Sequence, residues 1–444
     1  MQDRREYCID FDQHDKWLRF FFENGYVILK RVVLPEEVAR AQVLVWDWLE
    51  SLGSGIRRDT PATWINANWP GAAKIGVFQS LCGAHSEAAW YLRGLSRVKE
   101  VFKRFWDTDD LLSSMESFVA LRPWWLSPEG EDWRPQEERL HCGQNPVYKP
   151  GIHCVQGLVL LQPVTSLTGG LVVVPQTHTP EVQAHFQKKY GHLARKPDDF
   201  CELRGNDKYM GKGQLLLAEA GDLILWDSRT ILGSLVGTGP VPDTAPITTK
   251  GVSVKEDEND LPFWGGFSEP IPAAEEELVW TPEVVPVQKP NIPDIGLARL
   301  GLRVCMTPRA WASPEVLAKR ILAFKLGKTL TGMPHEYHEC TLPDADGRNI
   351  RSQALRLVYK PLHLSPTQRA LVGFSEDDRD GSDGDGSESC PPSPVPAAAQ
   401  ESPRASTVVD VGEGPVDDGA TLGCVLDVNQ DLLEPLSERR LGTP

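Results

Sequence analysis

The sequence predicts a mainly β protein with flanking helices, and three observations lead to this prediction. Between residues 152 and 235, short apolar runs alternate with Gly, Pro and Asp, as in a β-sandwich or barrel and unlike alternating βαβ units. Most helical patterns lie before residue 107 or after residue 313. Hydrophobic residues form 41% of the 444 residues and charged residues 24%, which is typical of a globular protein with an ample core.

The N-terminal part predicts a helix, a strand and a second helix. Residues 15–24 have helix-like apolar spacing that stops at Gly25, and residues 26–33 follow as a strand. Residues 35–53 begin with Pro35 and two acids and end at a glycine, which are start and stop signals of a helix. Two further helices are expected at 86–95 and 97–106, and one strand at 111–121.

The central part supplies the strands of the core. Strands are expected at 158–164, 171–175, 214–217, 223–226 and 230–235, with one helix at 180–190. A strand at 299–306 and a helix at 314–326 complete the pattern.

We expect one folded domain over residues 1–374. Within it, residues 236–297 are rich in Pro, Gly, Thr and Glu, which predicts an insertion or lid. Residues 375–444 hold 16 acidic and 4 basic residues and so carry most of the net charge of −16, which predicts an acidic, disordered tail and a candidate protein-interaction segment. The nearly neutral remainder has no basic block, which argues against a nucleic-acid or anionic-membrane partner.

The nine cysteines predict a reducing compartment, because their number is odd, they are scattered, and none forms a Cys-x-x-Cys pair. The N-terminus lacks an apolar signal core and no apolar run approaches the length of a membrane span. The C-terminal Leu-Gly-Thr-Pro is not a peroxisomal address. We therefore expect an intracellular, cytoplasmic protein.

Several ordered blocks of the sequence resemble one enzyme family. The blocks are Leu140-His-Cys-Gly-Gln-Asn-Pro146 with its continuation to Pro175, Ala220-Gly-Asp-Leu-Ile-Leu-Trp-Asp-Ser-Arg-Thr-Ile-Leu-Gly-Ser234 and Val304-Cys-Met-Thr-Pro-Arg309. Together with residues 24–30 and 109–114 they look like the phytanoyl-CoA dioxygenase-like (PhyH) family of Fe(II)/2-oxoglutarate-dependent oxygenases, over roughly residues 15–373. The resemblance implies a double-stranded β-helix (jelly-roll, cupin-like) core and oxidation of a small molecule with O2, Fe(II) and 2-oxoglutarate.

The resemblance also implies a metal triad of His-x-Asp and a distal His. Two imidazoles and one carboxylate then occupy one face of Fe(II) and leave three positions for 2-oxoglutarate and O2. In this chain His141 keeps the first position, but Gly143 stands at the carboxylate position and Leu232 at that of the distal histidine. Some halogenating relatives lack the carboxylate, but the loss of both partners predicts a degenerate site.

Arg299 is the candidate that the family implies for the 2-oxoglutarate carboxylate, with Arg303 as runner-up on the same face of the strand. The alternative for either residue is an exposed or ion-paired arginine.

Other side chains are candidates for substitute ligands. Those in the same stretches are Cys142, His153, Cys154, His178 and Asp227. Alternation along a strand turns Cys142 away from His141, and His178 fits a structural or pocket-lining role. In His85-Ser-Glu87 the serine is expected to cap a helix. His335, His338 and Cys340 have zinc-like spacing, but no matching distal pair follows.

The leading interpretation is a phytanoyl-CoA dioxygenase-like pseudoenzyme whose retention of Fe(II) and 2-oxoglutarate is in question. One alternative is an active 2-oxoglutarate-dependent dioxygenase, for small-molecule hydroxylation, with a rebuilt metal site. A second alternative is a non-enzymatic binding or scaffold protein whose acidic tail is the interaction module.

Overall fold

The computed structural model describes residues 7–70, 76–78, 81–192, 199–240, 296–330, 332–339 and 359–375. The chain divides into two units, Met1–Asp380 and Gly381–Pro444, and the second unit lies outside the described residues. The expected acidic tail beyond Ser375 and residues 241–295 of the expected insertion also lie outside them.

Two β-sheets form the core of the first unit. The larger sheet has the order β1 (Cys8–Asp10), β2 (Tyr26–Lys30), β10 (Leu223–Asp227), β6 (Val155–Leu160), β12 (Arg299–Pro308) and β3 (Leu111–Ser113), and β4 (Phe118–Leu121) also pairs with β12. The smaller sheet has the order β8 (Cys201–Glu202), β5 (His141–Cys142), β11 (Ile231–Val236), β7 (Gly169–Val174) and β9 (Gln214–Leu215). These two sheets are the expected double-stranded β-helix.

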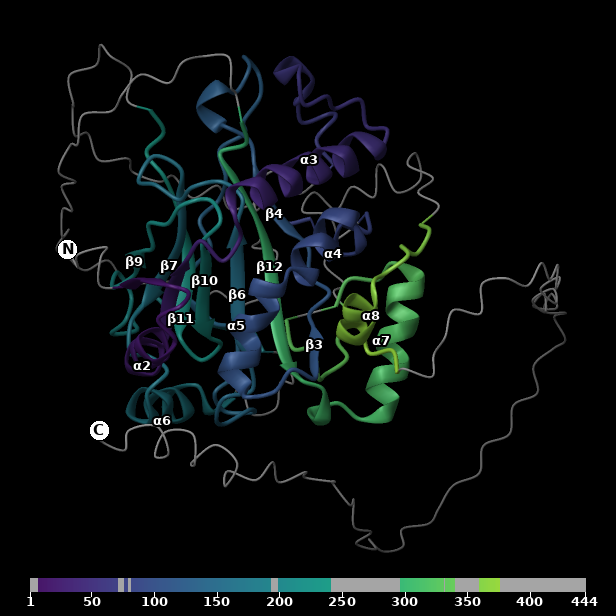
Figure 1. Cartoon of the computed structure of the whole chain (residues 1–444). Helices are drawn as coiled ribbons and strands as arrows, with labels where there is room; N and C mark the ends of the chain where they lie inside the picture. The colour runs from purple at the N-terminus through teal and green to yellow at the C-terminus, as the bar shows by residue number, and fades with distance from the viewer. Residues whose placement is uncertain are drawn as a thin grey trace, which may run out of the picture. The chain divides into compact units, whose positions relative to one another are not determined.

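Helices flank the β core, so the fold mixes α and β elements. They are α2 (His14–Asn24), α3 (Pro35–Ser51), α4 (Glu87–Gly94), α5 (Ser96–Trp106), α6 (Pro180–Lys189), α7 (Pro314–Leu326) and α8 (Pro366–Val372). In Figure 1, α4 and α5 lie beside the β12 and β6 side of the larger sheet, whereas α6 lies near the smaller sheet. None of the described helices is both long and apolar enough to cross a membrane.

Side-chain alternation along β6 separates two apolar layers. Val155 and Val159 join the cluster that contains the helix residues, whereas Leu158 and Leu160 face a cluster between the sheets. This inter-sheet cluster consists of Tyr7, Cys8, Tyr26, Ile28, Leu160, Val164, Val173, Leu216, Ala218, Ile224, Trp226 and Leu232, with Leu158 and three other partly buried residues against it. Because both sheets contribute to it, the inter-sheet cluster is the interior of the barrel.

Most expected elements are present, and the differences have local causes. The strand expected at 26–33 ends at Lys30, because Arg31 has a left-handed φ of 52° and its amide donates to Asp222. The strand expected at 111–121 is two strands, β3 and β4, since residues 115–117 interrupt the pairing with β12.

Four short strands and α-helices of the described chain were not predicted from the sequence: β1, β5, β8 and α8. β5 and β8 have two residues each, which is too short to show the alternation of apolar and polar residues that marks a strand. Helix α8 has a signal in the sequence, because Ser365 and Gln368 form a capping box at its start.

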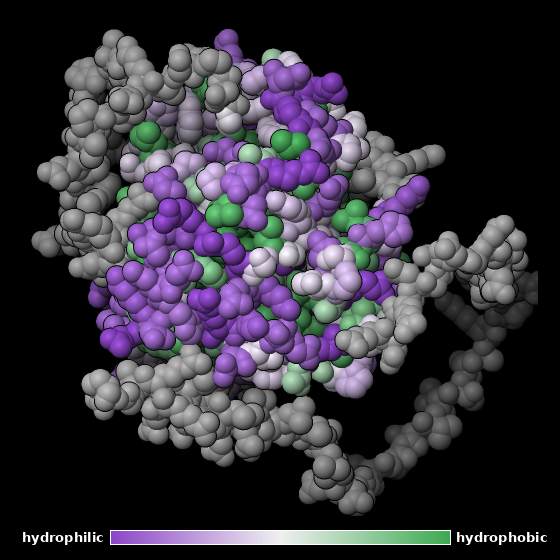
Figure 2. All heavy atoms as spheres, in the orientation of Figure 1, coloured by the Kyte–Doolittle hydropathy of each residue, from purple (hydrophilic) through white to green (hydrophobic). Residues whose placement is uncertain are grey.

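The visible surface is largely hydrophilic. Figure 2 shows hydrophobic residues there in small separate patches. Exposed large hydrophobic side chains in the described part of the chain include Phe22, Leu126, Tyr148, Leu322 and Leu326.

Candidate functional site

His141 and Leu232 lie directly opposite each other on neighbouring strands. In the register of β5 and β11, Leu232 pairs with His141 and Ile231 pairs with Cys142. Opposed residues of an antiparallel pair share a face of the sheet. Leu232 belongs to the inter-sheet cluster, so His141 is on the inner face, and Cys142 is in the outer cluster with Ile231 and Phe186. Leu232 therefore stands beside the imidazole.

The His141 ring is held by its own neighbours. Its Nδ1 lies 2.9 Å from the carbonyl oxygen of Arg139, which can only accept, so Nδ1 carries the proton of this bond. The ring stacks on Phe200 with centroids 4.4 Å apart, and Nε2 lies 3.8 Å from a carboxylate oxygen of Glu138. His141 is 5% exposed. Nε2 is the atom left to accept a proton or coordinate a metal.

Gln156 occupies the space beside Gly143. A Cβ atom added at Gly143 would lie 3.0 Å from Gln156 Oε1, which accepts a hydrogen bond from Trp226 Nε1 at 2.9 Å. A side chain at position 143 would therefore require the Gln156 amide to shift.

The segment after α7 closes against the same residues. A Cβ at Gly332 would lie 2.9 Å from Gln156 Nε2 and 3.1 Å from Glu116 Oε2. The thiol of Cys154 lies 3.1 Å from the Gly332 carbonyl oxygen and 3.0 Å from the thiol of Cys305. Residues 332–339 thus cover the end of the barrel at which β6 begins and β12 ends.

Glu116, in the loop between β3 and β4, is one acidic residue at this end of the barrel. Burial raises the pKa of its carboxyl group, and the positive charges of Arg303 and Arg93 oppose that rise. Arg93 is fully buried and donates to the Ala84 and Glu116 carbonyl oxygens. Two arginines, Arg303 and Arg93, therefore already offset the negative charge of Glu116.

The two candidate arginines have different surroundings. The guanidinium of Arg299 donates to the carbonyl oxygens of Thr168, at 2.8 Å, and Leu235, and burial lowers its pKa to about 10. Leu235 is three residues beyond Leu232, or roughly 10 Å along a strand. Arg303 pairs in register with Leu158, which packs against the inter-sheet cluster. Of the two, Arg303 lies nearer to the inner residues.

Several other candidates are held by structural partners. Asp227 accepts two hydrogen bonds from the Arg229 side chain, at 2.9 and 2.6 Å. His178 Nε2 donates to the Phe22 carbonyl at 2.9 Å, at the end of α2. His85 Nε2 donates to the Lys328 carbonyl oxygen at 2.7 Å. Ser86 caps α4 as expected, because its hydroxyl accepts a hydrogen bond from the amide of Ala89.

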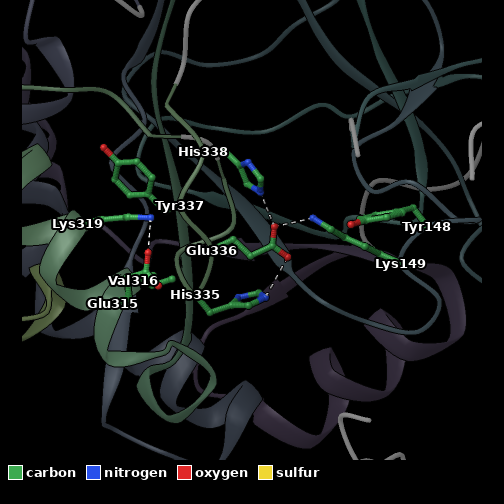
Figure 3. A pocket seen from close by; sticks show the side chains of 9 residues that line it. All are labelled: Tyr148, Lys149, Glu315, Val316, Lys319, His335, Glu336, Tyr337 and His338. Atoms are coloured by element: carbon green, nitrogen blue, oxygen red, sulfur yellow. Dashed lines mark hydrogen bonds and ion pairs between the residues drawn. The ribbon is translucent and has the colours of Figure 1, made fainter. Parts of the chain in front are cut away.

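A second cluster of polar residues lies outside the barrel interior. Ligand-type atoms of His153, His335 and Glu336 all lie within 4.8 Å of one another. A pocket of about 390 Å³ adjoins this cluster and is lined by Tyr148, Lys149, Glu315, Val316, Lys319, His335, Glu336, Tyr337 and His338. Figure 3 shows the carboxylate of Glu336 between Lys149, His335 and His338.

The sequence did not indicate that His153 and His335 would meet, because 181 residues separate them and no spacing rule connects them. The sequence singled out His335 with His338 and Cys340, but Cys340 lies outside the described residues and the structure brings His335 to His153 instead. Gln156 and Glu116 were also not singled out, since a lone polar residue in a strand or loop has no distinguishing signal.

Comparison with known proteins supports a likeness to one family. The model of the phytanoyl-CoA dioxygenase (PhyH) family matches residues 21–237. This range includes His141, Gly143 and Leu232 but ends before β12 with Arg299 and Arg303. One relative is "Ava biosynthesis cluster protein O" of Aspergillus versicolor, which is 27% identical over 248 residues, or 52% of this chain and 76% of that protein.

Solved structures with a similar arrangement include two non-heme enzymes. The alpha ketoglutarate dependent carbocyclase SnoK from nogalamycin biosynthesis has 13% identity and a TM-score of 0.35, covering 65% of this chain and 82% of its own. The non-heme monooxygenase ThoJ, in its nickel complex, has 11% identity and a TM-score of 0.34, covering 66% of this chain and 77% of its own.

Proposed function

We propose that this phytanoyl-CoA dioxygenase-like protein does not carry out the Fe(II)/2-oxoglutarate oxygenase reaction at the family's metal position. It acts instead by binding a small-molecule ligand without oxidising it. One observation carries the proposal: Leu232, an apolar residue of the inter-sheet cluster, is the direct neighbour of His141. An aliphatic side chain offers no lone pair, so it cannot complete a metal site there.

The remaining donors at that position fit Fe(II) and 2-oxoglutarate poorly. His141 offers one nitrogen, with a Glu138 carboxylate oxygen 3.8 Å from it, and Gly143 offers no side chain. Among the described residues, His141 belongs to no group of three His, Cys, Asp or Glu ligand atoms that could hold a metal ion. A two-histidine, one-carboxylate site needs three protein ligands on one face. The Arg299 guanidinium, the candidate for the 2-oxoglutarate carboxylate, already donates hydrogen bonds to two backbone carbonyl oxygens. These residues are therefore not expected to support the oxygenase reaction.

Turnover assays test the proposal directly. The purified full chain, supplied with Fe(II), 2-oxoglutarate and O2, is expected to form no succinate above the level of a control without protein. Stoichiometric Fe(II) binding that depends on His141, together with succinate formation, would overturn the proposal.

The register behind the proposal can be tested by rebuilding the triad. We expect the variant Gly143→Asp, Leu232→His, Gln156→Ala to gain Fe(II) binding, measured by calorimetry under argon, because it supplies two imidazoles and a carboxylate and removes the amide that a side chain at position 143 would have to shift. The matched control adds His141→Ala to the same variant and should lose the gain. Since a buried histidine at position 232 costs stability, thermal unfolding is measured first. Folded protein with no gain in iron affinity would count against the register.

A second candidate function is an active 2-oxoglutarate-dependent dioxygenase with its metal elsewhere. The observation that favours it is the group of two histidines and one glutamate outside the barrel interior. It predicts succinate formation that survives His141→Ala but not a substitution of His335. The first proposal predicts no succinate in either protein.

A further inference from the structure

We propose that His153, His335 and Glu336 bind a divalent transition-metal ion beside the pocket at the end of the barrel. This site is distinct from the position that the family assigns to iron, and the proposal does not depend on whether the chain turns over 2-oxoglutarate.

Two separate parts of the fold bring the ligands together. His153 lies two residues before β6, and its amide donates to the side chain of Gln144, which is fully buried. His335 and Glu336 lie in the segment after α7, where the Glu336 amide closes a turn on the carbonyl of Met333. The rings of His153 and His335 have centroids 6.4 Å apart. Both parts are tied to the barrel, so the three ligands are held near one another.

The spacing is close to that of a metal site. The three ligand atoms lie within 4.8 Å of one another. Around Zn²⁺, with bonds of about 2.0–2.1 Å and tetrahedral angles, neighbouring ligand atoms are about 3.4 Å apart. Closure therefore needs movements on the order of 1 Å, which side-chain rotation of the half-buried His153 and Glu336 can supply.

The neighbours of the two rings leave a nitrogen available on each. His153 Nε2 donates to the Pro150 carbonyl at 3.2 Å, and because a carbonyl only accepts, Nδ1 keeps its lone pair. His335 Nδ1 lies 3.3 Å from the hydroxyl of Thr307, and Trp311 packs edge-on against the ring. With Nδ1–H donating to that hydroxyl, Nε2 faces Glu336. Such outer hydrogen bonds are how metal-binding imidazoles are usually oriented.

One carboxylate oxygen of Glu336 already has two partners, and the other faces His335. Lys149 Nζ and His338 Nε2 lie 2.6 and 2.9 Å from Oε2, whereas Oε1 lies 3.7 Å from His335 Nε2. Burial alone would raise the pKa of Glu336, but the hydrogen bond and charge of Lys149 outweigh it and lower the pKa. Lys149 is also paired with Asp199 at 2.7 Å, which balances part of the positive charge beside the metal.

The donor set points to a class of ion. Two imidazoles and one carboxylate suit Zn²⁺, Fe²⁺ or Co²⁺, whereas Mg²⁺ and Ca²⁺ prefer oxygen ligands. Three protein ligands leave at least one coordination position for water or a small ligand. The adjoining pocket of about 390 Å³ gives that position access to solvent.

Metal titration of the full chain tests the proposal. The protein is stripped with a chelator, dialysed, and titrated with Zn²⁺ by calorimetry and with Co²⁺ by visible absorption, which reports ligand geometry. We expect one tightly bound ion per chain. His153→Gln and His335→Gln should each weaken binding at least tenfold, and Glu336→Gln should weaken it in the same direction.

Two controls separate this site from others. His363→Gln removes an exposed histidine elsewhere, and His141→Gln removes the histidine at the family's metal position. Both should leave the affinity unchanged. Zn²⁺ should also raise the unfolding temperature of the wild type and of both controls but not of His335→Gln.

The outcomes are distinct. The inference would be overturned if the wild type bound no metal, or if His153→Gln and His335→Gln bound it as tightly as the wild type. Either result would show that the cluster is only an ion-paired surface. A loss of binding in His141→Gln alone would also overturn it and would favour the family's position. Metal-dependent succinate formation that requires His335 would uphold the site while refuting the function proposed above.

Discussion

At the residue scale, most buried histidines of the described chain are held by main-chain oxygen atoms. His85, His141 and His178 each lie within 2.9 Å of a backbone carbonyl oxygen. Such a bond fixes the tautomer and the orientation of a ring without any ligand. His153 and His335 differ, because their ligand-type atoms also lie within 4.8 Å of each other and of a Glu336 carboxylate oxygen.

His85 makes stability depend on pH. Burial is the main reason that its pKa falls from 6.5 to about 4, and the charges of Arg93 and Arg320 add to the fall. The unfolded chain takes up a proton below about pH 6.5 and the folded chain only near pH 4, so stability is full above pH 6.5 and is lost as the pH falls toward 4. We expect this residue to contribute up to roughly 3 kcal/mol to the free energy of unfolding above pH 6.5.

The measurement is the free energy of unfolding in urea at pH 7.5, 6 and 5. His85→Gln should have a shallower loss between pH 6.5 and 5 than the wild type. His363→Gln, an exposed control, should follow the wild type. Identical slopes for all three proteins would show that His85 is not responsible.

At the scale of elements, Arg320 links both C-terminal helices, α7 and α8, to the barrel. Arg320 of α7 is fully buried and donates to the carbonyl oxygens of Val372, Pro334 and Ser113 at 3.0, 2.9 and 2.7 Å. Burial lowers its pKa to about 9, which leaves it charged at pH 7. Since Pro334 precedes His335, the same side chain also anchors the segment that carries two of the proposed ligands.

Arg320→Met is expected to destabilise the fold by about 3 kcal/mol, because it leaves several buried carbonyl oxygens without a donor. Chemical denaturation measures this change. Lys325→Met, an exposed position on the same helix, should cost less than about 0.5 kcal/mol. Equal effects of the two substitutions would mean that the buried hydrogen bonds do not hold the helices in place.

At the scale of the whole molecule, the contacts of the first unit extend to its last described residues. Arg309, next to β12, donates to the carbonyl oxygens of Gly373 and Phe374 at 2.9 and 3.2 Å. Leu371 and Val372 of α8 are buried in the main apolar cluster. A cut before residue 370 would therefore expose core surface.

Truncation after Ser375 tests the predicted domain boundary. We expect the shortened chain to unfold cooperatively within about 1 °C of the full chain, because the described contacts of α8 remain, whereas truncation after His363 removes α8 and should lower the midpoint by several degrees. Scanning calorimetry measures both. A large loss in the first truncation would assign residues 376–444 a role in the fold.

The sequence by itself determined the order of the major elements and the family likeness. Hydrophobic periodicity and the residues that start or stop an element are local properties, so α3, α7, β7 and β10 could be predicted from nearby residues. The ordered blocks around His141 and Leu232 indicated the fold. The two-residue strands β5 and β8 could not be predicted, since their existence depends on partners distant in sequence.

Only the tertiary structure decided which side chains meet. It placed Leu232 opposite His141, set Gln156 against Gly143, and brought His153 to His335 across 181 intervening residues. The physical reason is that strand register and loop packing act between segments that share no local pattern. A ligand set depends on distances of a few ångströms, and no periodicity in one sequence encodes them.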